Sequence, residues 1–135
     1  MAISDAQSGG LILSSSVPYQ ITLAGTVVKG DLIGYSSGWK RALATTGTAI
    51  QAKCVASQAG KSGDTIVAYF GKCIVGGRYS GGTPGTQIYS AEGTSNGQIT
   101  ETAPSTGGDC NKCIGIQLSA TEVLIDCNAN LDTTG

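Results

Sequence analysis

The stretch Thr65-Ile66-Val67-Ala68-Tyr69-Phe70-Gly71-Lys72-Cys73-Ile74-Val75 decides the fold class. Residues that favour strands, β-branched and aromatic, fill most of it on both sides of Gly71. A glycine inside such a run indicates a bulge or a bend. We therefore expect extended structure across Thr65–Val75, with a change of direction at this glycine.

Strand signals recur along the rest of the chain. Tyr19–Leu23 alternates apolar and polar residues, as a half-buried strand does. Thr86–Tyr89 and Gln98–Thr100 flank Ser95-Asn96-Gly97, and Asn-Gly is a strong hairpin signal. Glu122–Cys127 is mostly apolar and is expected to be a strand buried on both faces. Gly, Pro or Ser/Thr clusters interrupt almost every window that could form a helix, so the sequence predicts an all-β protein.

An internal repeat indicates two related units. Lys53–Ala59 matches Lys112–Leu118, 59 residues further along, with Lys, Cys and Gln at identical places. The match favours a strand within Thr48–Ala59, a glycine-free stretch that by itself could also be helical. We expect two related β-units, at about 26–75 and 84–127, in one compact β-barrel or sandwich. Two copies are too few for a solenoid.

The first 16 residues differ from the rest. Ser4–Gly10 is polar, Leu11, Ile12 and Leu13 form a short apolar patch, and a serine spacer follows. A frayed terminus is one interpretation. The other is an extended, flexible N-terminal arm, residues 1–16, that becomes ordered on a partner by burying the three apolar residues. Residues 17–135 would then be the single barrel domain.

Composition excludes several classes of partner. Charged residues make up 13% of the chain, the net charge is −1, and only Lys40 and Arg41 are adjacent basic residues. No basic patch for nucleic acid or for a membrane surface is visible. The longest apolar stretches, such as Thr65–Phe70, fall far short of the roughly 20 residues that span a bilayer. Met1–Asp5 lacks the pattern of a signal peptide, so we expect a chain used without secretion.

The sequence gives little support for a catalytic function. The chain contains no histidine, the commonest general base, and its nine acidic residues are spread singly. We therefore expect no enzyme activity and no small-molecule substrate. A small enzyme that uses a cysteine is the alternative, to be tested by thiol reactivity.

The five cysteines have two interpretations. They are Cys54, Cys73, Cys110, Cys113 and Cys127. An odd number in an unsecreted chain argues against a disulfide framework. Cys110-Asn111-Lys112-Cys113 has the spacing of a redox or zinc half-site, but no histidine is available to complete a zinc site. Cys113 also aligns with Cys54 in the repeat, so buried thiols without a cofactor are expected.

Trp39 and Arg41 are candidates for contact with a partner or a second copy. Tryptophan and arginine are over-represented at binding hot spots. The alternative is that Trp39, the only tryptophan, covers one end of the core after the Ser36–Gly38 turn.

Turn-and-strand motifs along the chain resemble a known family. In the first half they are Val28–Ile33, Gly38-Trp39, Cys54–Ala56 and Gly63–Val67. In the second half they are Pro84–Tyr89, Gly97–Thr100 and Ile114–Ala120. Together these motifs, over about Val27–Cys127, resemble small capsid decoration or cement proteins of tailed bacteriophages. The motifs carry no catalytic signature, and similar patterns occur in phage head fibres.

The resemblance implies a fold, a location and a partner. It implies a β-tulip barrel, commonly a homotrimer, that binds the major capsid protein on the exterior of the virion after synthesis in the host cytoplasm. It also implies an N-terminal arm on neighbouring capsid subunits, which would make Leu11, Ile12 and Leu13 capsid-binding. The five cysteines depart from the family pattern. The main rival is a head-fibre or tail domain that binds a receptor or glycan through Tyr35, Tyr79, Tyr89 or Trp39.

Overall fold

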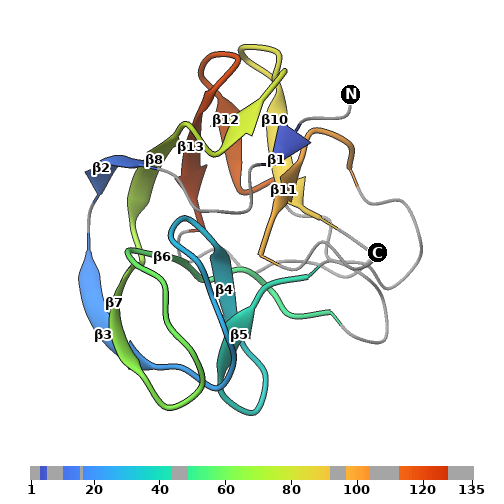
Figure 1. The fold of residues 1–135 in the computed structure, drawn as a ribbon. Helices are drawn as coiled ribbons and strands as arrows, with labels where there is room; N and C mark the ends of the chain where they lie inside the picture. Colours follow the sequence, from blue (N-terminus) through green and yellow to red (C-terminus); the bar gives the residue numbers. More distant parts are fainter. Residues whose placement is uncertain are drawn as a thin grey trace.

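The chain folds into short strands joined by turns (Figure 1). The computed structural model describes residues 4–5, 11–15, 17–43, 49–91, 97–103 and 113–127, with side chains from Val17 onward. No helix occurs among these residues. The all-β fold class expected from the sequence is therefore confirmed.

Most strands belong to two antiparallel sheets, and one pair stands apart. The strands are β1 (Ser4–Asp5), β2 (Leu11–Ser15), β3 (Pro18–Thr22), β4 (Leu32–Tyr35), β5 (Trp39–Arg41), β6 (Cys54–Ala56), β7 (Thr65–Tyr69), β8 (Lys72–Gly76), β9 (Tyr79–Ser80), β10 (Gln87–Ser90), β11 (Ile99–Thr100), β12 (Gly115–Gln117) and β13 (Glu122–Asp126). The separate pair is β1 with β9.

The two sheets share one design. Sheet A consists of β3, β7, β6, β4 and β5 in that order, and sheet B of β8, β13, β12, β10 and β11. If the five strands of each sheet are numbered one to five along the chain, they lie side by side in the order one, five, four, two, three. Sheet B carries β2 as an additional strand at the outer edge of β8. The five-strand units thus run over residues 18–69 and 72–126, whereas the sequence repeat was expected over 26–75 and 84–127.

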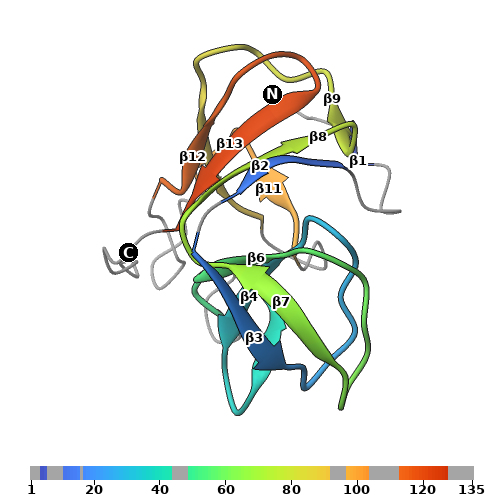
Figure 2. The same cartoon turned by 90° about the vertical axis from the view of Figure 1, so that its left-hand side faces the viewer.

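A two-stranded ribbon connects the sheets. β2 leads into β3 and β7 leads into β8, while β2 pairs with β8 and β3 pairs with β7. At the crossing point the Phe70 N–H donates to the Val17 carbonyl oxygen at 3.0 Å. Val17 has a φ of 53°, which an L residue adopts only where a local change of direction requires it. Figure 2 shows the ribbon passing from sheet B to sheet A.

Several expectations about single strands can be checked against the pairing. The change of direction at Gly71 is confirmed, because β7 ends in sheet A at Tyr69 and β8 begins in sheet B at Lys72. The expected pairing of the strands around Asn-Gly is confirmed by antiparallel β10 and β11. Burial of the last strand on both faces is wrong: Val123 and Ile125 are buried, and their neighbours are half-buried. Only one face of β13 packs on the core.

Neither sheet closes into a barrel among the described strands. Sheet A ends at β3 and β5, and sheet B ends at β2 and β11. The structure shows two antiparallel sheets, whereas the sequence allowed either a compact barrel or a sandwich, and the barrel stays a prediction. Residues 11–15, assigned to an arm by the sequence, pair with β8 as strand β2. The side chains of Leu11, Ile12 and Leu13, and the remainder of the arm apart from β1, lie outside the described residues.

Two hydrophobic clusters hold the fold together. The larger one takes members from both sheets: Leu32, Ala42, Ala52, Val55, Cys73, Val75, Tyr79, Ile88, Ile99, Ile114, Val123, Ile125 and Cys127. The smaller one belongs to sheet A and its loops: Ile21, Leu23, Val27, Ile33, Cys54, Ala56, Ile66 and Ala68. Burial of each large aliphatic side chain stabilises the fold by about 1.5–3 kcal/mol. Since the larger cluster spans both sheets, each sheet needs the other to cover its inner face.

Gly34 of β4 lies directly against the backbone of the segment that precedes β6. A Cβ atom at this position would overlap the backbone carbonyl oxygen of Gln51. We expect Gly34→Ala to lower the free energy of unfolding by about 3 kcal/mol, because backbone must move to accept the methyl group. At Gly25 a Cβ would lie 3.8 Å from Lys40 Cγ, an ordinary contact, so Gly25→Ala should change stability by less than about 0.5 kcal/mol. Urea unfolding measures both, and equal stabilities of the two variants would contradict the packing described.

Candidate functional site

Four aromatic rings form a continuous row on sheet A. The rings of Tyr19 and Phe70 have centroids 5.9 Å apart, those of Phe70 and Trp39 5.7 Å, and those of Trp39 and Tyr35 5.2 Å. Each pair meets edge to face, a favoured arrangement for aromatic side chains. We call these four side chains the aromatic surface.

Backbone hydrogen bonds and one tight turn position the rings. Tyr35 and Trp39 face each other across β4 and β5. The turn between these strands contains Ser37 and Gly38 with φ of 55° and 128°, and a Cβ at Gly38 would overlap Ala24. Only glycine fits this position, which fixes the turn and with it the pairing of Tyr35 with Trp39.

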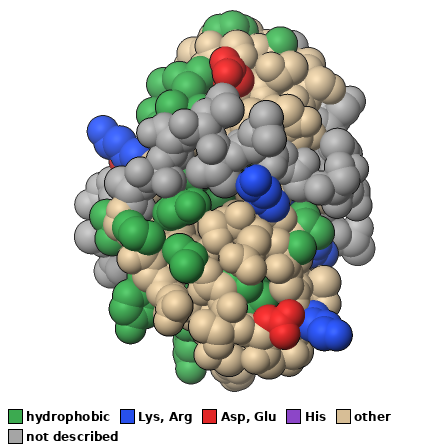
Figure 3. Space-filling view, turned by 60° about the vertical axis from the view of Figure 1, so that its left-hand side comes forward, with side chains coloured by type: hydrophobic (Ala, Val, Ile, Leu, Met, Phe, Trp, Pro, Cys, Tyr) green, Lys and Arg blue, Asp and Glu red, His purple; other side chains and the backbone are tan. Residues whose placement is uncertain are grey.

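The aromatic surface is largely open to solvent. Val17, Tyr19 and Tyr35 are 60%, 65% and 64% exposed, whereas Trp39 and Phe70 are half-buried against the smaller core cluster. A shallow depression of about 330 Å³ lies between the rings, lined by Val17, Pro18, Tyr19, Trp39 and Phe70. No charged side chain lines it. Figure 3, turned toward the side of β3 and β7, shows apolar side chains among other uncharged surface, with few charged side chains.

The structure places the predicted partner residues Trp39 and Arg41 in different settings. Trp39 lies on the aromatic surface and also packs on the core, so both interpretations of its role fit its position. Arg41 Nε donates to Asp31 Oδ2 at 2.6 Å, which gives its side chain an internal partner. Contact of either residue with another chain stays a prediction.

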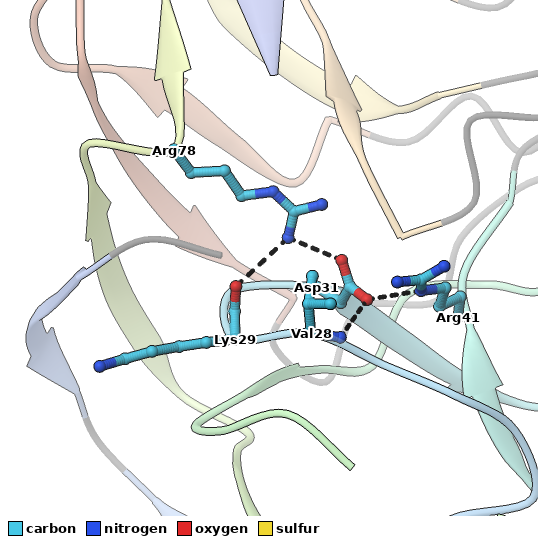
Figure 4. A network of polar contacts seen from close by, with 5 residues as sticks. All are labelled: Val28, Lys29, Asp31, Arg41 and Arg78. Atoms are coloured by element: carbon cyan, nitrogen blue, oxygen red, sulfur yellow. Dashed lines mark hydrogen bonds and ion pairs between the residues drawn. The ribbon is translucent and has the colours of Figure 1, made fainter. Parts of the chain in front are cut away.

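Asp31 is the centre of a buried charge network (Figure 4). Its side chain is fully buried, and Oδ2 accepts hydrogen bonds from Arg41 Nε and, at 2.8 Å, from the Val28 N–H. Arg78 Nη1 lies 2.6 Å from Asp31 Oδ1, an ion pair by distance although the N–H is not aligned for a hydrogen bond. At that distance in a buried site, the attraction between the carboxylate and the guanidinium outweighs the unfavourable hydrogen-bond angle.

The network joins the two sheets. Arg78 follows β8 of sheet B, while Asp31 and Arg41 belong to sheet A, and Arg78 Nη1 also reaches the Lys29 carbonyl oxygen at 3.4 Å. The guanidinium of Arg78 lies over the Tyr79 ring, 5.2 Å from its centroid. Sequence reasoning included Asp31 only within the motif Val28–Ile33 and did not single out Arg78. No local pattern links these residues, because the contact exists only after the sheets pack.

The cysteines are mostly buried thiols. Cys54, Cys73 and Cys127 are buried. Burial raises the pKa of Cys73 to about 11. Burial, and to a smaller extent the nearby Cys127, raises the pKa of Cys54 well above its usual range. Because the thiolate is the reactive form, neither thiol is suited to nucleophilic chemistry.

Cys113 differs from the core position expected for it. It is half-exposed, its Sγ lies 3.2 Å from the Gly115 carbonyl oxygen, and it lines a second depression with Lys72, Ile116 and Asp126. The repeat partner Cys54 is buried because the smaller core cluster covers it. Cys110, the other half of the Cys-x-x-Cys pair, lies outside the described residues.

The tyrosines considered for sugar stacking fall into three environments. Tyr35 is exposed on the aromatic surface, whereas Tyr79 is buried in the larger core cluster and cannot meet a ligand. Tyr89 is half-buried on sheet B, with its hydroxyl 2.8 Å from Gln87 Oε1. Sequence reasoning missed Tyr19 and Phe70, since they join Trp39 only through the pairing of β3 with β7.

Comparison with known proteins finds no protein-family model, no curated protein and no solved structure that matches this chain. In the part of the chain that the structure describes, no helix is long and apolar enough to cross a membrane. Within that same part, no three His, Cys, Asp or Glu side chains are grouped to hold a metal ion. The exposed rings and the apolar depression between them make the aromatic surface the candidate functional site.

Asp31→Asn tests the charge network. The substitution removes the buried negative charge that lies 2.6 Å from Arg78, so we expect a loss of about 3–5 kcal/mol in the free energy of unfolding. Asp64→Asn is a matched control, because Asp64 Oδ2 accepts the Lys61 N–H at 3.0 Å in the same kind of turn but is exposed. The control should lose less than about 1 kcal/mol. Similar losses for both variants in thermal or urea unfolding would contradict a role for the buried charges.

Thiol labelling tests the cysteine environments. At pH 8 in the folded protein, a maleimide should modify Cys113 rapidly and leave Cys54, Cys73 and Cys127 unmodified, because burial blocks access to all three. The raised pKa values also keep Cys54 and Cys73 protonated at this pH. Peptide mapping by mass spectrometry assigns each site, and urea-denatured protein provides the fully labelled reference. Rapid modification of Cys54 or Cys73 in the folded state would show that the core is more open than described.

Proposed function

We propose that this chain is a structural virion protein that binds the outside of an assembled phage capsid and stabilises it. The observation that carries the proposal is the exposed, uncharged aromatic surface on a scaffold of two packed sheets. Tyrosine and tryptophan supply large contact areas and are enriched at binding hot spots. The resemblance of the turn-and-strand motifs to decoration proteins names the partner, the major capsid protein.

The chemistry of the surface favours adhesion over catalysis. Binding that depends on aromatic burial needs no titratable group and no cofactor. Because no charged side chain lines the depression, long-range electrostatic steering contributes little. The affinity should accordingly vary little with ionic strength, unlike that of a protein that binds through charged patches.

Several weak contacts would add to a stable attachment. The resemblance implies a homotrimer with a β-tulip fold at three-fold positions of the head, and a trimer would engage several capsid subunits at once. The second and third engagements are then effectively intramolecular. Binding only to the assembled shell stabilises it by mass action, by about 4 kcal/mol at a thousandfold excess over the dissociation constant.

Leu11, Ile12 and Leu13 keep their proposed role as capsid-binding residues. β2 is hydrogen-bonded to β8 along one side. Contact with the shell through this segment would therefore use the other, outer side of β2.

A second candidate is a head-fibre or tail domain that binds a host receptor or glycan. Exposed Tyr19 and Tyr35 beside the half-buried Trp39 favour it, because aromatic faces stack on sugar rings. A glycan array separates the two functions. A clear signal that disappears in Tyr35→Ser would favour the receptor-binding function, and particle binding without any glycan signal would favour the capsid function.

Loss of two exposed rings should weaken capsid binding. We expect Tyr19→Ser/Tyr35→Ser to lower the affinity for particles that lack this protein by at least about tenfold, because both rings lose their contact area. Tyr89→Ser, a tyrosine change on sheet B, should bind as the unaltered protein does. Co-sedimentation with particles at two salt concentrations measures both effects. Unchanged binding of the double variant would remove the aromatic surface from the contact.

A further inference from the structure

Three hydrogen-bond donors on the aromatic surface are available to a ligand. Within the described residues, the hydroxyls of Tyr19 and Tyr35 make no hydrogen bond, and both side chains are largely exposed. The Nε1–H of Trp39 makes no hydrogen bond there either, and it is accessible to solvent. The hydroxyl of Tyr89 on sheet B differs, because it lies 2.8 Å from Gln87 Oε1 within the chain.

The space beside these donors is apolar. The depression of about 330 Å³ takes its aliphatic lining from Val17 and Pro18 and its aromatic lining from three of the four rings. No carboxylate, amide, lysine or arginine side chain lines it. A ligand that matches this surface is therefore uncharged, presents apolar groups to the depression, and carries hydrogen-bond acceptors beside them.

Backbone hydrogen bonds hold the lining residues in place without a ligand. The Phe70 N–H donates to the Val17 carbonyl oxygen at 3.0 Å, and the Ala24 N–H donates to the Trp39 carbonyl oxygen at 2.9 Å. Tyr35 is held opposite Trp39 by the pairing of β4 with β5. The surface is thus preformed, and a ligand that is also preformed loses the least conformational entropy on binding.

A proline-containing segment in the polyproline II conformation has the required properties. This helix makes no internal hydrogen bonds, so all its backbone carbonyl oxygens can accept one from a partner. Proline has no N–H, which leaves an apolar ring next to an acceptor. Segments of this kind bind in grooves lined by aromatic side chains, and they are ordered before binding.

Other ligand shapes would leave the three donors unused or lack partners themselves. In an α-helix the backbone carbonyl oxygens are already bonded within the helix. A β-strand binds through the backbone of a sheet edge, whereas the donors here are side chains. Sugar hydroxyls donate as well as accept, and the depression offers no carboxylate or amide side chain to accept from them.

We propose that the aromatic surface binds an uncharged, proline-containing segment of a capsid subunit in the polyproline II conformation. Proline rings occupy the depression beside Trp39 and Phe70. Carbonyl oxygens of the segment accept hydrogen bonds from the hydroxyls of Tyr19 and Tyr35 and from Trp39 Nε1. The inference rests on the proposed function and specifies the kind of capsid segment that the surface takes.

Tyr19→Phe/Tyr35→Phe in the full chain tests the hydrogen bonds. The double variant keeps both rings and removes both hydroxyls, neither of which is bonded within the described residues. We expect it to bind particles produced without this protein at least about fivefold more weakly, because two hydrogen bonds are lost. Tyr89→Phe, which removes a hydroxyl from sheet B, should bind as the unaltered chain does. Equal urea unfolding transitions would verify that both variants keep the fold.

A blocked oligoproline peptide is the direct probe. Trp39 is the only tryptophan, so its fluorescence reports on the aromatic surface alone. We expect a saturable change in this fluorescence with oligoproline, and no change with a blocked glycine–serine peptide of equal length. An excess of oligoproline should also release the chain from particles.

The outcomes separate the two proposals. If the unaltered chain does not bind particles, the proposed function fails, and binding of a capsid segment fails with it. If Tyr19→Ser/Tyr35→Ser loses binding but Tyr19→Phe/Tyr35→Phe keeps it in full, the rings contact the capsid without the hydroxyls, and only the polyproline inference is overturned. An unchanged Trp39 fluorescence with oligoproline overturns it as well. A sugar that changes this fluorescence where oligoproline does not would assign the surface to glycans and also contradict the inference.

Discussion

The buried carboxylate of Asp31 constrains how the two sheets fit together. It lies between Arg78, which follows the first strand of sheet B, and Arg41, in sheet A. A Cβ at Gly97 would come within 2.8 Å of Asp31 Cγ, so the backbone from the second unit also packs directly on this group. A buried charge is tolerated only when paired, so the sheets have few alternative ways to pack. This arrangement holds the start of β4 and the end of β5, the two strands that carry Tyr35 and Trp39 of the aromatic surface.

The aromatic surface arises because the two faces of sheet A are covered to different extents. One face, with Leu32 and Val55, packs into the core shared with sheet B. The other face is covered by loops that connect the strands of sheet A. Trp39 and Phe70 lie at the margin of this covered region and remain half-buried. Rings at such a rim stabilise the domain with one side and leave the other side open to solvent. This dual position explains how a protein with few charges exposes a continuous row of aromatic rings.

The sequence could predict the local features and not the assembled ones. Strand alternation, the break at Gly71 and the Asn-Gly signal depend on neighbouring residues, so the strands they predict occur. The repeat of Lys53–Ala59 indicated two related units but not the strand order that they share. The boundaries of the units could not be predicted, because they depend on which sheet β8 joins. The row of rings and the Asp31 network join residues far apart in the chain, and no periodicity reports such contacts. Trp39 was found because tryptophan is rare here, whereas Tyr19 and Phe70 gave no comparable signal.

Cryo-electron microscopy of mature particles with and without the gene for this chain tests the central claim most directly. The account predicts difference density on the outer capsid surface that fits the two-sheet fold, with the aromatic surface of sheet A turned toward the shell. Particles that lack the polypeptide altogether, or density that turns the aromatic surface to solvent, would contradict it.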